Sequence, residues 1–187
     1  MENKLPKLGN RRDDTLRGQT GFTLIELLVT VAILTILLSI AVPSFITFVQ
    51  DSRLVGQTND LVTSLNFARS EAIKRGVRVS VCSRASNTAC SGAAVVNWDT
   101  GWLVFINPNN NAAADAGETV LQVRQPLENG NTLRTAGLQR VTYLNSGFSG
   151  NADTFRLCDV RGTASGRAIA VSVQGRVSTT TGTTACP

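Results

Sequence analysis

The chain has 187 residues, a formal net charge of +5 and no histidine. The lack of histidine argues against a haem site or a histidine-rich metal site, and the commonest general base of enzymes is missing. The scattered serines and carboxylates form no catalytic set. The composition therefore predicts one domain with a single core and argues against an enzyme, a cofactor and a small-molecule substrate.

The N-terminus joins a polar, mainly basic leader to an apolar segment that lasts until Val49. Between Phe22 and Gln50 the only charge is Glu26. As a helix, this segment is long enough to cross about 30 Å of hydrocarbon. An ordinary secretory signal has a shorter apolar centre. Neither such a signal nor a plain single-pass anchor explains a carboxylate there, and carboxylates in membrane segments are usually functional.

The helical pattern continues beyond the apolar segment with a different periodicity. Apolar residues recur at helical spacing at Leu54, Leu61, Leu65, Ala68 and Ala72. Gly76 follows the basic pair Lys74-Arg75 and is well placed to end the helix. We therefore predict one helix from near Phe22 to Arg75, apolar all round in its first half and amphipathic in its second.

The rest of the chain is typical of short strands joined by turns. Candidate strands are Val77–Val81, Trp102–Ile106, Thr119–Val123, Val141–Leu144, Phe155–Cys158, Ala168–Val173 and a shorter one near Arg176–Ser178. Their short spacings favour antiparallel hairpins. The sequence thus predicts an α+β fold in which a long N-terminal helix packs on an antiparallel β-sheet.

The junction Gly21-Phe22-Thr23-Leu24-Ile25-Glu26 resembles the processing site of type IV prepilins and pseudopilins. The resemblance implies that prepilin peptidase cleaves after Gly21 and that Phe22 becomes N-methylated. It also implies a removed leader (residues 1–21), a transmembrane and assembly half-helix (22–50) and an extracytoplasmic pilin domain (51–187).

Glu26 and Pro43 acquire roles from this resemblance. Cleavage would expose an α-amino group near an apolar helix, and the Glu26 carboxylate could pair with such a cation on its own or a neighbouring chain. In the family, this pairing is thought to register an incoming subunit. Pilins often carry a proline where Pro43 stands, and the helix loosens there in filaments. A tolerated kink explains Pro43 equally well.

Two further segments narrow the resemblance. The segment 97–105, with Trp98 and Trp102, and the segment 155–159 resemble the GspH/FimT branch. That branch implies a minor pilin of the FimT or FimU type, or alternatively the H-type pseudopilin of type II secretion. Its implied partners are other pilins or pseudopilins. The implied location is the inner membrane, with the domain in the periplasm, followed by the pilus or pseudopilus.

Four cysteines, Cys82, Cys90, Cys158 and Cys186, lie beyond the apolar segment. Their even number indicates an oxidising compartment and two disulfides. A four-cysteine zinc site is the alternative, but close CxxC pairs are absent. Three connectivities remain open, of which local pairing is the simplest.

A calcium loop is a second metal hypothesis. Asn107, Asn109, Asn111, Asp115 and Glu118 have the side-chain spacing of an EF-hand loop. However, Ala112 replaces the glycine that the turn needs, and the flanking elements are predicted strands. An asparagine-rich connection explains the same residues more simply.

Arginines dominate the positive charge, and Lys74 is the only lysine beyond the leader. The guanidinium fork suits phosphate, so Arg140, Arg161, Arg167 and Arg176 are candidates for binding double-stranded DNA. FimT-type pilins are implicated in DNA uptake through a Gly-Arg-x-Arg motif, but here Gly175-Arg176-Val177-Ser178 lacks the second arginine. A solvated surface, or a contact for acidic faces of other pilins, is the alternative.

Overall fold

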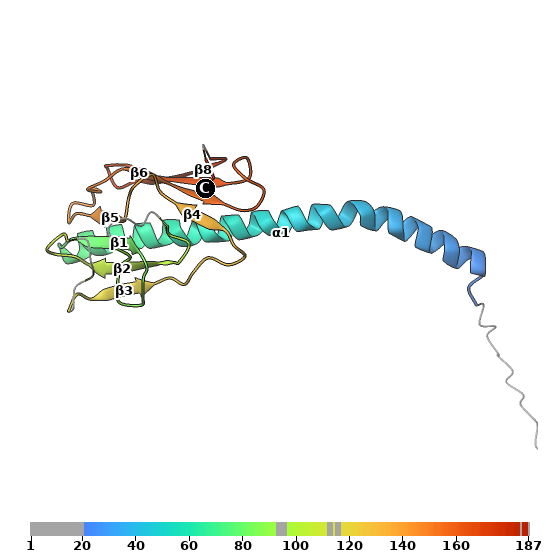
Figure 1. Ribbon diagram of the computed structural model, residues 1–187, viewed down its shortest axis with the longest axis horizontal. Helices are drawn as coiled ribbons and strands as arrows, with labels where there is room; N and C mark the ends of the chain where they lie inside the picture. Colours follow the sequence, from blue (N-terminus) through green and yellow to red (C-terminus); the bar gives the residue numbers. More distant parts are fainter. Residues whose placement is uncertain (1–20, 93–96, 112–113, 115–116, 184, 187) are drawn as a thin grey trace, which may run out of the picture. The chain divides into compact units, whose positions relative to one another are not determined.

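The computed structural model describes residues 21–92, 97–111, 114, 117–183 and 185–186. The chain divides into two compact units, Met1–Ser44 and Phe45–Pro187. Its elements are α1 (Leu24–Arg75), β1 (Val79–Ser83), β2 (Trp102–Ile106), β3 (Val120–Val123), β4 (Thr132–Arg134), β5 (Arg140–Tyr143), β6 (Asp153–Cys158), β7 (Arg167–Val171) and β8 (Val177–Thr181) (Figure 1).

The first unit contains the apolar start of α1. Thr23 caps the helix, because its Oγ1 accepts a hydrogen bond from the Glu26 backbone N–H at 3.2 Å. The hydroxyls of Thr30, Thr35 and Ser39 donate to backbone carbonyls one turn earlier, at 2.7–2.9 Å. The polar groups of this stretch are thus largely satisfied within the helix itself. The helix is long and apolar enough to cross a membrane.

The second half of α1 is amphipathic, as predicted. All five apolar residues of the expected stripe, from Leu54 to Ala72, are fully buried. Gly76 follows the last helical residue with φ of 68°, a left-handed conformation that suits glycine at a helix C-terminus. Glu71 pairs with Arg75 at 2.5 Å, four residues on, and so links the last two turns.

The strands form two antiparallel four-stranded sheets, where the sequence predicted one. The orders are β3-β2-β1-β5 and β4-β6-β7-β8. The first strand begins at Val79 rather than Val77, because residues 77 and 78 carry the chain away from the helix end. β4 was not predicted, since three residues are too few for an alternating pattern to show.

One core joins α1 to the inner faces of both sheets. It contains Val81 and Val104 from the first sheet and Phe155 and Ile169 from the second. Trp98 packs edge-on against Phe155, with ring centroids 4.8 Å apart. A smaller cluster covers the outer face of the first sheet, at Cys82, Leu103 and Phe105. β1 is therefore buried on both faces, whereas the outer face of the second sheet is not covered in this way.

Two disulfides close local loops, Cys82–Cys90 and Cys158–Cys186. This is the local pairing among the three connectivities that the sequence left open. The segment after β8, from Gly182 to Cys186, is called the tail. It is also held by backbone hydrogen bonds, from Gly182 N–H to Gly166 O and from Thr183 N–H to Thr163 O. The Cys158–Cys186 disulfide closes the longer loop, with a sequence separation of 28. A crosslink over a loop of that size stabilises a fold by about 3–4 kcal/mol in the chain-entropy model.

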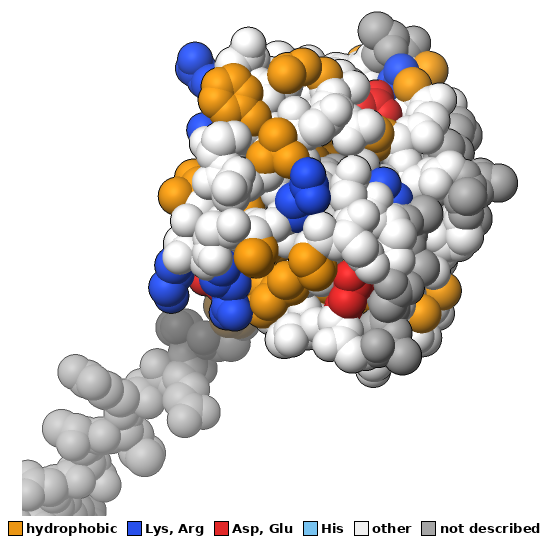
Figure 2. All heavy atoms as spheres, turned by 90° about the vertical axis from the view of Figure 1, so that its left-hand side faces the viewer, with side chains coloured by type: hydrophobic (Ala, Val, Ile, Leu, Met, Phe, Trp, Pro, Cys, Tyr) orange, Lys and Arg blue, Asp and Glu red, His pale blue; other side chains and the backbone are white. Residues whose placement is uncertain are grey.

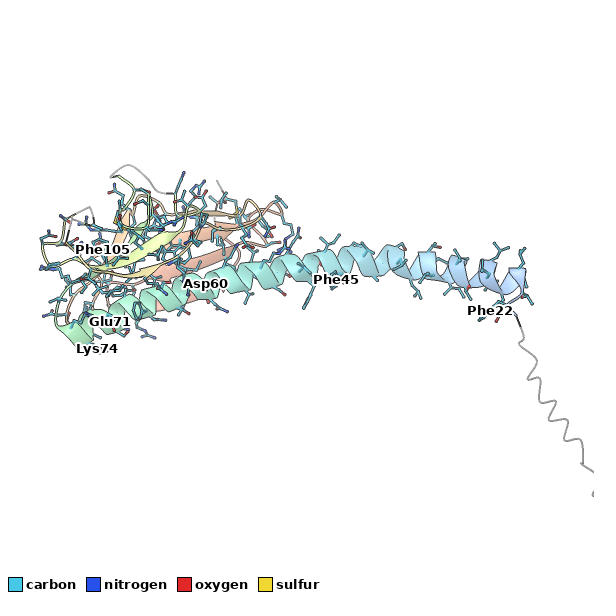
Figure 3. The ribbon with its side chains drawn as sticks, turned by 90° about the horizontal axis from the view of Figure 1, so that it is seen from below. Phe22, Phe45, Asp60, Glu71, Lys74 and Phe105 are labelled. Carbon is cyan, nitrogen blue, oxygen red and sulfur yellow. A yellow bond between two sulfur atoms is a disulfide. The ribbon has the colours of Figure 1, made fainter. Side chains whose placement is uncertain are left out.

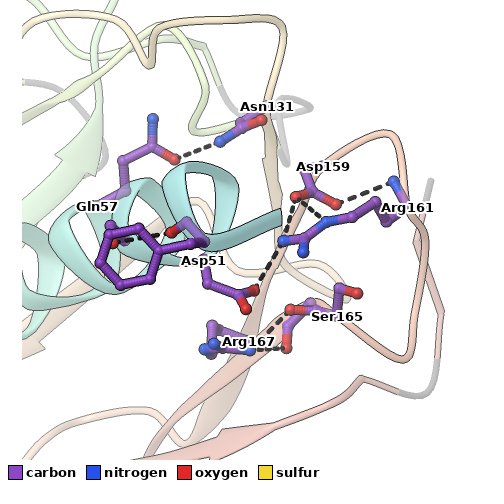
Figure 4. Close-up of polar contacts among 10 residues, drawn as sticks. Asp51, Gln57, Asn131, Asp159, Arg161, Ser165 and Arg167 are labelled. Carbon is purple, nitrogen blue, oxygen red and sulfur yellow. Dashed lines mark hydrogen bonds and ion pairs between the residues drawn. The ribbon is translucent and has the colours of Figure 1, made fainter. Parts of the chain in front are cut away.

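A three-residue ionic cluster ties α1 to the turn after β6 (Figure 4). Arg161 Nη2 lies 2.9 Å from Asp51 Oδ1 and 2.7 Å from Asp159 Oδ2. Burial raises the pKa of Asp159, but its hydrogen bonds to Arg161 and the nearby positive charge together outweigh burial. The pKa of this carboxyl is therefore below its ordinary value. We call Asp51, Asp159 and Arg161 the Arg161 cluster.

The Arg161 cluster predicts a component of acid sensitivity. Because the pKa of Asp159 is lower in the folded state, its stabilisation is complete above its unfolded-state pKa of about 4. It is lost as pH falls further, through the folded-state value. We expect Asp159→Asn to reduce the fall in unfolding free energy between pH 5 and pH 2. Urea unfolding at several pH values measures this, with the exposed Glu128→Gln as the charge-matched control. Equal slopes for Asp159→Asn and wild type would contradict the assignment.

Candidate functional site

The predicted cleavage point lies just before the helix. Gly21 and Phe22 precede Leu24, the first residue of α1, and the Phe22 side chain is 83% exposed. A Cβ placed on Gly21 would meet no atom within 4 Å. The described fold thus gives no packing reason for a glycine at this position. Exposed, non-helical backbone is the conformation in which proteases cut most readily.

Glu26 lies in the first turn of α1 with its side chain in the exposed apolar surface. Within the described residues, its carboxylate makes no hydrogen bond or ion pair. Its backbone N–H donates to Thr23 Oγ1, so Thr23 and Glu26 stand at the Ncap and N3 positions, but the reciprocal bond of a capping box, from the Thr23 N–H to the Glu26 carboxylate, is not made. The Thr-x-x-Glu spacing was present in the sequence, and it assigns Thr23 a role that our prediction overlooked.

No described residue outside α1 covers the apolar half of this helix. Its large side chains project from the helix with exposures such as 67% for Phe45 and 63% for Ile36 (Figure 3). α1 continues through Pro43, which has no N–H to donate to the carbonyl four residues earlier. The boundary between the two compact units follows directly, between Ser44 and Phe45. Pro43 therefore marks the point where the helix is locally least supported by its own hydrogen bonds.

Three of the four candidate DNA-binding arginines are engaged within the fold. Arg161 belongs to the Arg161 cluster. Arg167 Nη1 donates to the Ser165 and Gly166 carbonyls at 2.7 and 3.2 Å, and Arg140 Nη2 donates to the Asn110 carbonyl at 3.0 Å. Arg140 lies on the first sheet and Arg167 on the second. Of these four arginines, only Arg176 is exposed without a side-chain partner among the described residues.

The segment Gly175-Arg176-Val177-Ser178 forms the turn into β8. Gly175 has φ of 74°, and a Cβ there would lie 2.2 Å from the Gly147 carbonyl oxygen, so this glycine is needed for close backbone approach. Arg176 and Ser178 are both exposed. On the face shown in Figure 2, lysine and arginine side chains are dispersed among neutral and hydrophobic ones. This dispersion is unlike a continuous basic track for a nucleic-acid backbone.

The asparagine-rich loop is organised by its own amides. Asn107 is fully buried, and its Nδ2 donates to Ser80 Oγ and to the Asn111 carbonyl, at 3.0 and 3.1 Å. Two guanidiniums, those of Arg78 and Arg140, donate to backbone carbonyls of this loop.

The positive charges of Arg78 and Arg140 beside this loop disfavour the binding of a calcium ion there. The described residues contain no group of three cysteine, aspartate or glutamate residues suited to a metal ion. Asp115, one of the five candidate ligands, lies outside the described residues. The calcium loop, which the sequence already disfavoured, stays an untested hypothesis, and the hydrogen bonds of Asn107 give the loop a structural explanation.

Comparisons with known proteins agree with this architecture. The family model described as type II transport protein GspH matches residues 57–175, and the prokaryotic N-terminal methylation motif matches residues 16–42. No curated protein sequence matches significantly.

Two crystal structures of the type IV minor pilin FimU from Pseudomonas aeruginosa show the same fold. At 18% identity, one aligns with a TM-score of 0.59 over 75% of this chain and 99% of its own. The other aligns with a TM-score of 0.55 over 70% of this chain and 97% of its own, also at 18% identity. The methylation motif implies processing by prepilin peptidase and assembly with other pilins, and the long helix on antiparallel sheets is the pilin fold. The chain therefore belongs to the GspH family of pilin-like proteins.

Proposed function

We propose that this chain is a minor pilin of a type IV pilus. Prepilin peptidase removes residues 1–21, and the apolar half of α1 holds the mature chain in the inner membrane, with the domain from Asp51 onward in the periplasm. The subunit then enters the filament near its tip, where it acts in initiation. The apolar half of α1 lines the filament core, and the sheets present edges and loops to other subunits.

The unpartnered Glu26 carboxylate is the observation that carries this proposal. A charge in apolar surroundings needs a partner, and the described residues of this chain supply none. Cleavage after Gly21 creates an α-amino group four residues away, and each neighbouring subunit brings another. A helix that is apolar on every side and unpacked has the surface expected of a segment that other helices will surround.

Two other functions remain candidates with less support. A pseudopilus subunit of type II secretion is supported by the description of the family model, whereas both similar solved structures are minor pilins. DNA uptake is supported by Arg176 alone, because the other three candidate arginines are engaged within the fold.

Deleting the gene in the source organism distinguishes a pilus from secretion. We expect fewer surface pili in a sheared-pilus preparation, with the spectrum of secreted proteins unchanged. Restoring the wild-type chain should restore the pili. Loss of secreted proteins with normal piliation would instead make the chain a pseudopilin.

Processing is tested by Gly21→Val. Nothing lies within 4 Å of the added Cβ, so a loss of cleavage would report recognition by the peptidase and not misfolding. We expect the precursor to accumulate, as seen by intact mass. Gly56→Val is the matched control, since Gly56 also has no atom within 4 Å, and it should be cleaved normally with an N-methylated Phe22. Normal cleavage of Gly21→Val would refute the assigned site.

The role of the Glu26 charge is tested by two substitutions. Glutamine keeps the size and polarity of the side chain but removes the charge, whereas valine removes both. If charge pairing registers the subunit, both variants should enter filaments at least tenfold less than wild type, and Thr30→Val should enter normally. The measurement is the amount of the subunit in sheared filaments relative to the cell fraction. Normal assembly of Glu26→Gln would refute a role for the charge.

A further inference from the structure

The outer face of the second sheet contains a hollow of about 400 Å³. On β6 and β7, Phe155, Leu157 and Ile169 point into the core, so the alternate residues Arg156 and Ala168 point outward. Antiparallel pairing places Arg156 opposite Ala168, and Ala168 opposite Thr180. The small Ala168 side chain thus leaves space between a guanidinium and a hydroxyl. The chief lining residues are Thr154, Arg156, Thr163, Ala168, Thr180 and Thr183.

Arg156 carries an uncompensated charge at this hollow. It lies directly opposite Arg134 of β4, and like charges in this position on antiparallel strands destabilise the pair. Arg134 is neutralised by an ion pair with Asp99. The Arg156 guanidinium makes no hydrogen bond or ion pair with any described residue, and no described carboxylate lines the hollow. A bound anion would relieve the repulsion that remains.

Threonine hydroxyl groups line the same hollow as the guanidinium. The Oγ1 atoms of Thr154, Thr163 and Thr180 make no hydrogen bond within the described part of the chain, so each is available to donate. They come from β6, from the turn before β7 and from β8, and so approach the hollow from different sides. Donors converging from several directions suit a tetrahedral oxyanion better than a planar carboxylate, and a guanidinium supplies two parallel N–H donors.

The tail fixes one wall of the hollow. Thr183 N–H donates to the Thr163 carbonyl at 3.0 Å, and Gly182 N–H donates to the Gly166 carbonyl at 2.8 Å. The Cys158–Cys186 disulfide closes the same segment. Gly166 allows this packing, because a Cβ there would lie 2.9 Å from Thr183 Cγ2. The donors are therefore held in place before a ligand arrives, which lowers the entropy cost of binding.

We propose that this hollow binds the phosphate group of a small phosphate ester, with Arg156 as the charged contact and the three threonines as hydroxyl donors. The hollow is larger than a phosphate group alone requires, so the ester's remaining atoms lie over Ala168 and Thr180. This site is independent of the filament function proposed above, since it involves neither Gly21 nor Glu26. Arg156 was not among the arginines that the sequence singled out.

Amide chemical shifts of the full-length chain in detergent micelles test the proposal. Inorganic phosphate is titrated at constant ionic strength, and acetate is titrated in parallel. We expect saturable shifts at the amides of Thr154 and Thr180 with phosphate and much weaker ones with acetate. Arg156→Gln should weaken the apparent phosphate affinity at least tenfold. Arg176→Gln removes the same charge from an exposed position outside the hollow and should change it less than twofold.

A second variant keeps the test decisive if Arg156→Gln perturbs the fold. Thr180→Val preserves side-chain shape and removes one donor, so it should weaken phosphate binding at least threefold. The exposed Ser178→Ala, two residues earlier on β8, should have no effect. Absence of saturable shifts, equal losses in Arg156→Gln and Arg176→Gln, or acetate binding as tight as phosphate would each overturn the phosphate site.

Discussion

The apolar stripe of α1 is fully buried at Leu54, Leu61, Leu65, Ala68 and Ala72. Because an isolated amphipathic helix cannot leave such a stripe in water, both sheets turn their inner faces toward it and form one core with it. The disulfides, the Arg161 cluster and the tail contacts hold the loops around this arrangement. The described residues provide no corresponding cover for the apolar half of the same helix, whose exposed surface suits lipid or the helices of other subunits.

The parts of the fold that depend on local periodicity were predictable from the sequence. The amphipathic stripe and the helix end at Gly76 were both predicted, because they depend on residues within a few turns of one another. The division into two sheets was not predicted, because strand partners are chosen by contacts between distant segments. The partners of the arginines could not be predicted from the sequence for the same reason. Arg161 is 110 residues from Asp51, and no local pattern signals their ion pair.

Arginine is preferred to lysine in this domain for a structural reason. Many guanidiniums donate to backbone carbonyls of loops: Arg69 to Gly147 and Gln174, Arg78 to Pro108, Arg84 to Thr100, Arg140 to Asn110 and Arg167 to Ser165. A guanidinium has five N–H donors in a rigid plane and can hold two carbonyls at once, as Arg69 does. The net positive charge of the domain is thus largely a by-product of how its turns are fastened. Arg156 is outside this pattern and lies in a hollow.

The hydroxyls of Thr30, Thr35 and Ser39 donate to carbonyls of their own helix and are not available to neighbouring molecules. This affects how such a helix can move between surroundings. In hydrocarbon and among apolar helices alike, this surface offers neighbours almost no hydrogen-bonding group other than Glu26. Because lipid tails are as apolar as leucine, exchanging lipid for neighbouring helices releases little free energy. Moving this helix from a bilayer into contact with other apolar helices therefore changes its solvation free energy only slightly. In the filament function proposed above, mechanical work from outside the chain would set the direction of this movement, and the ion pair proposed for Glu26 would set where it stops.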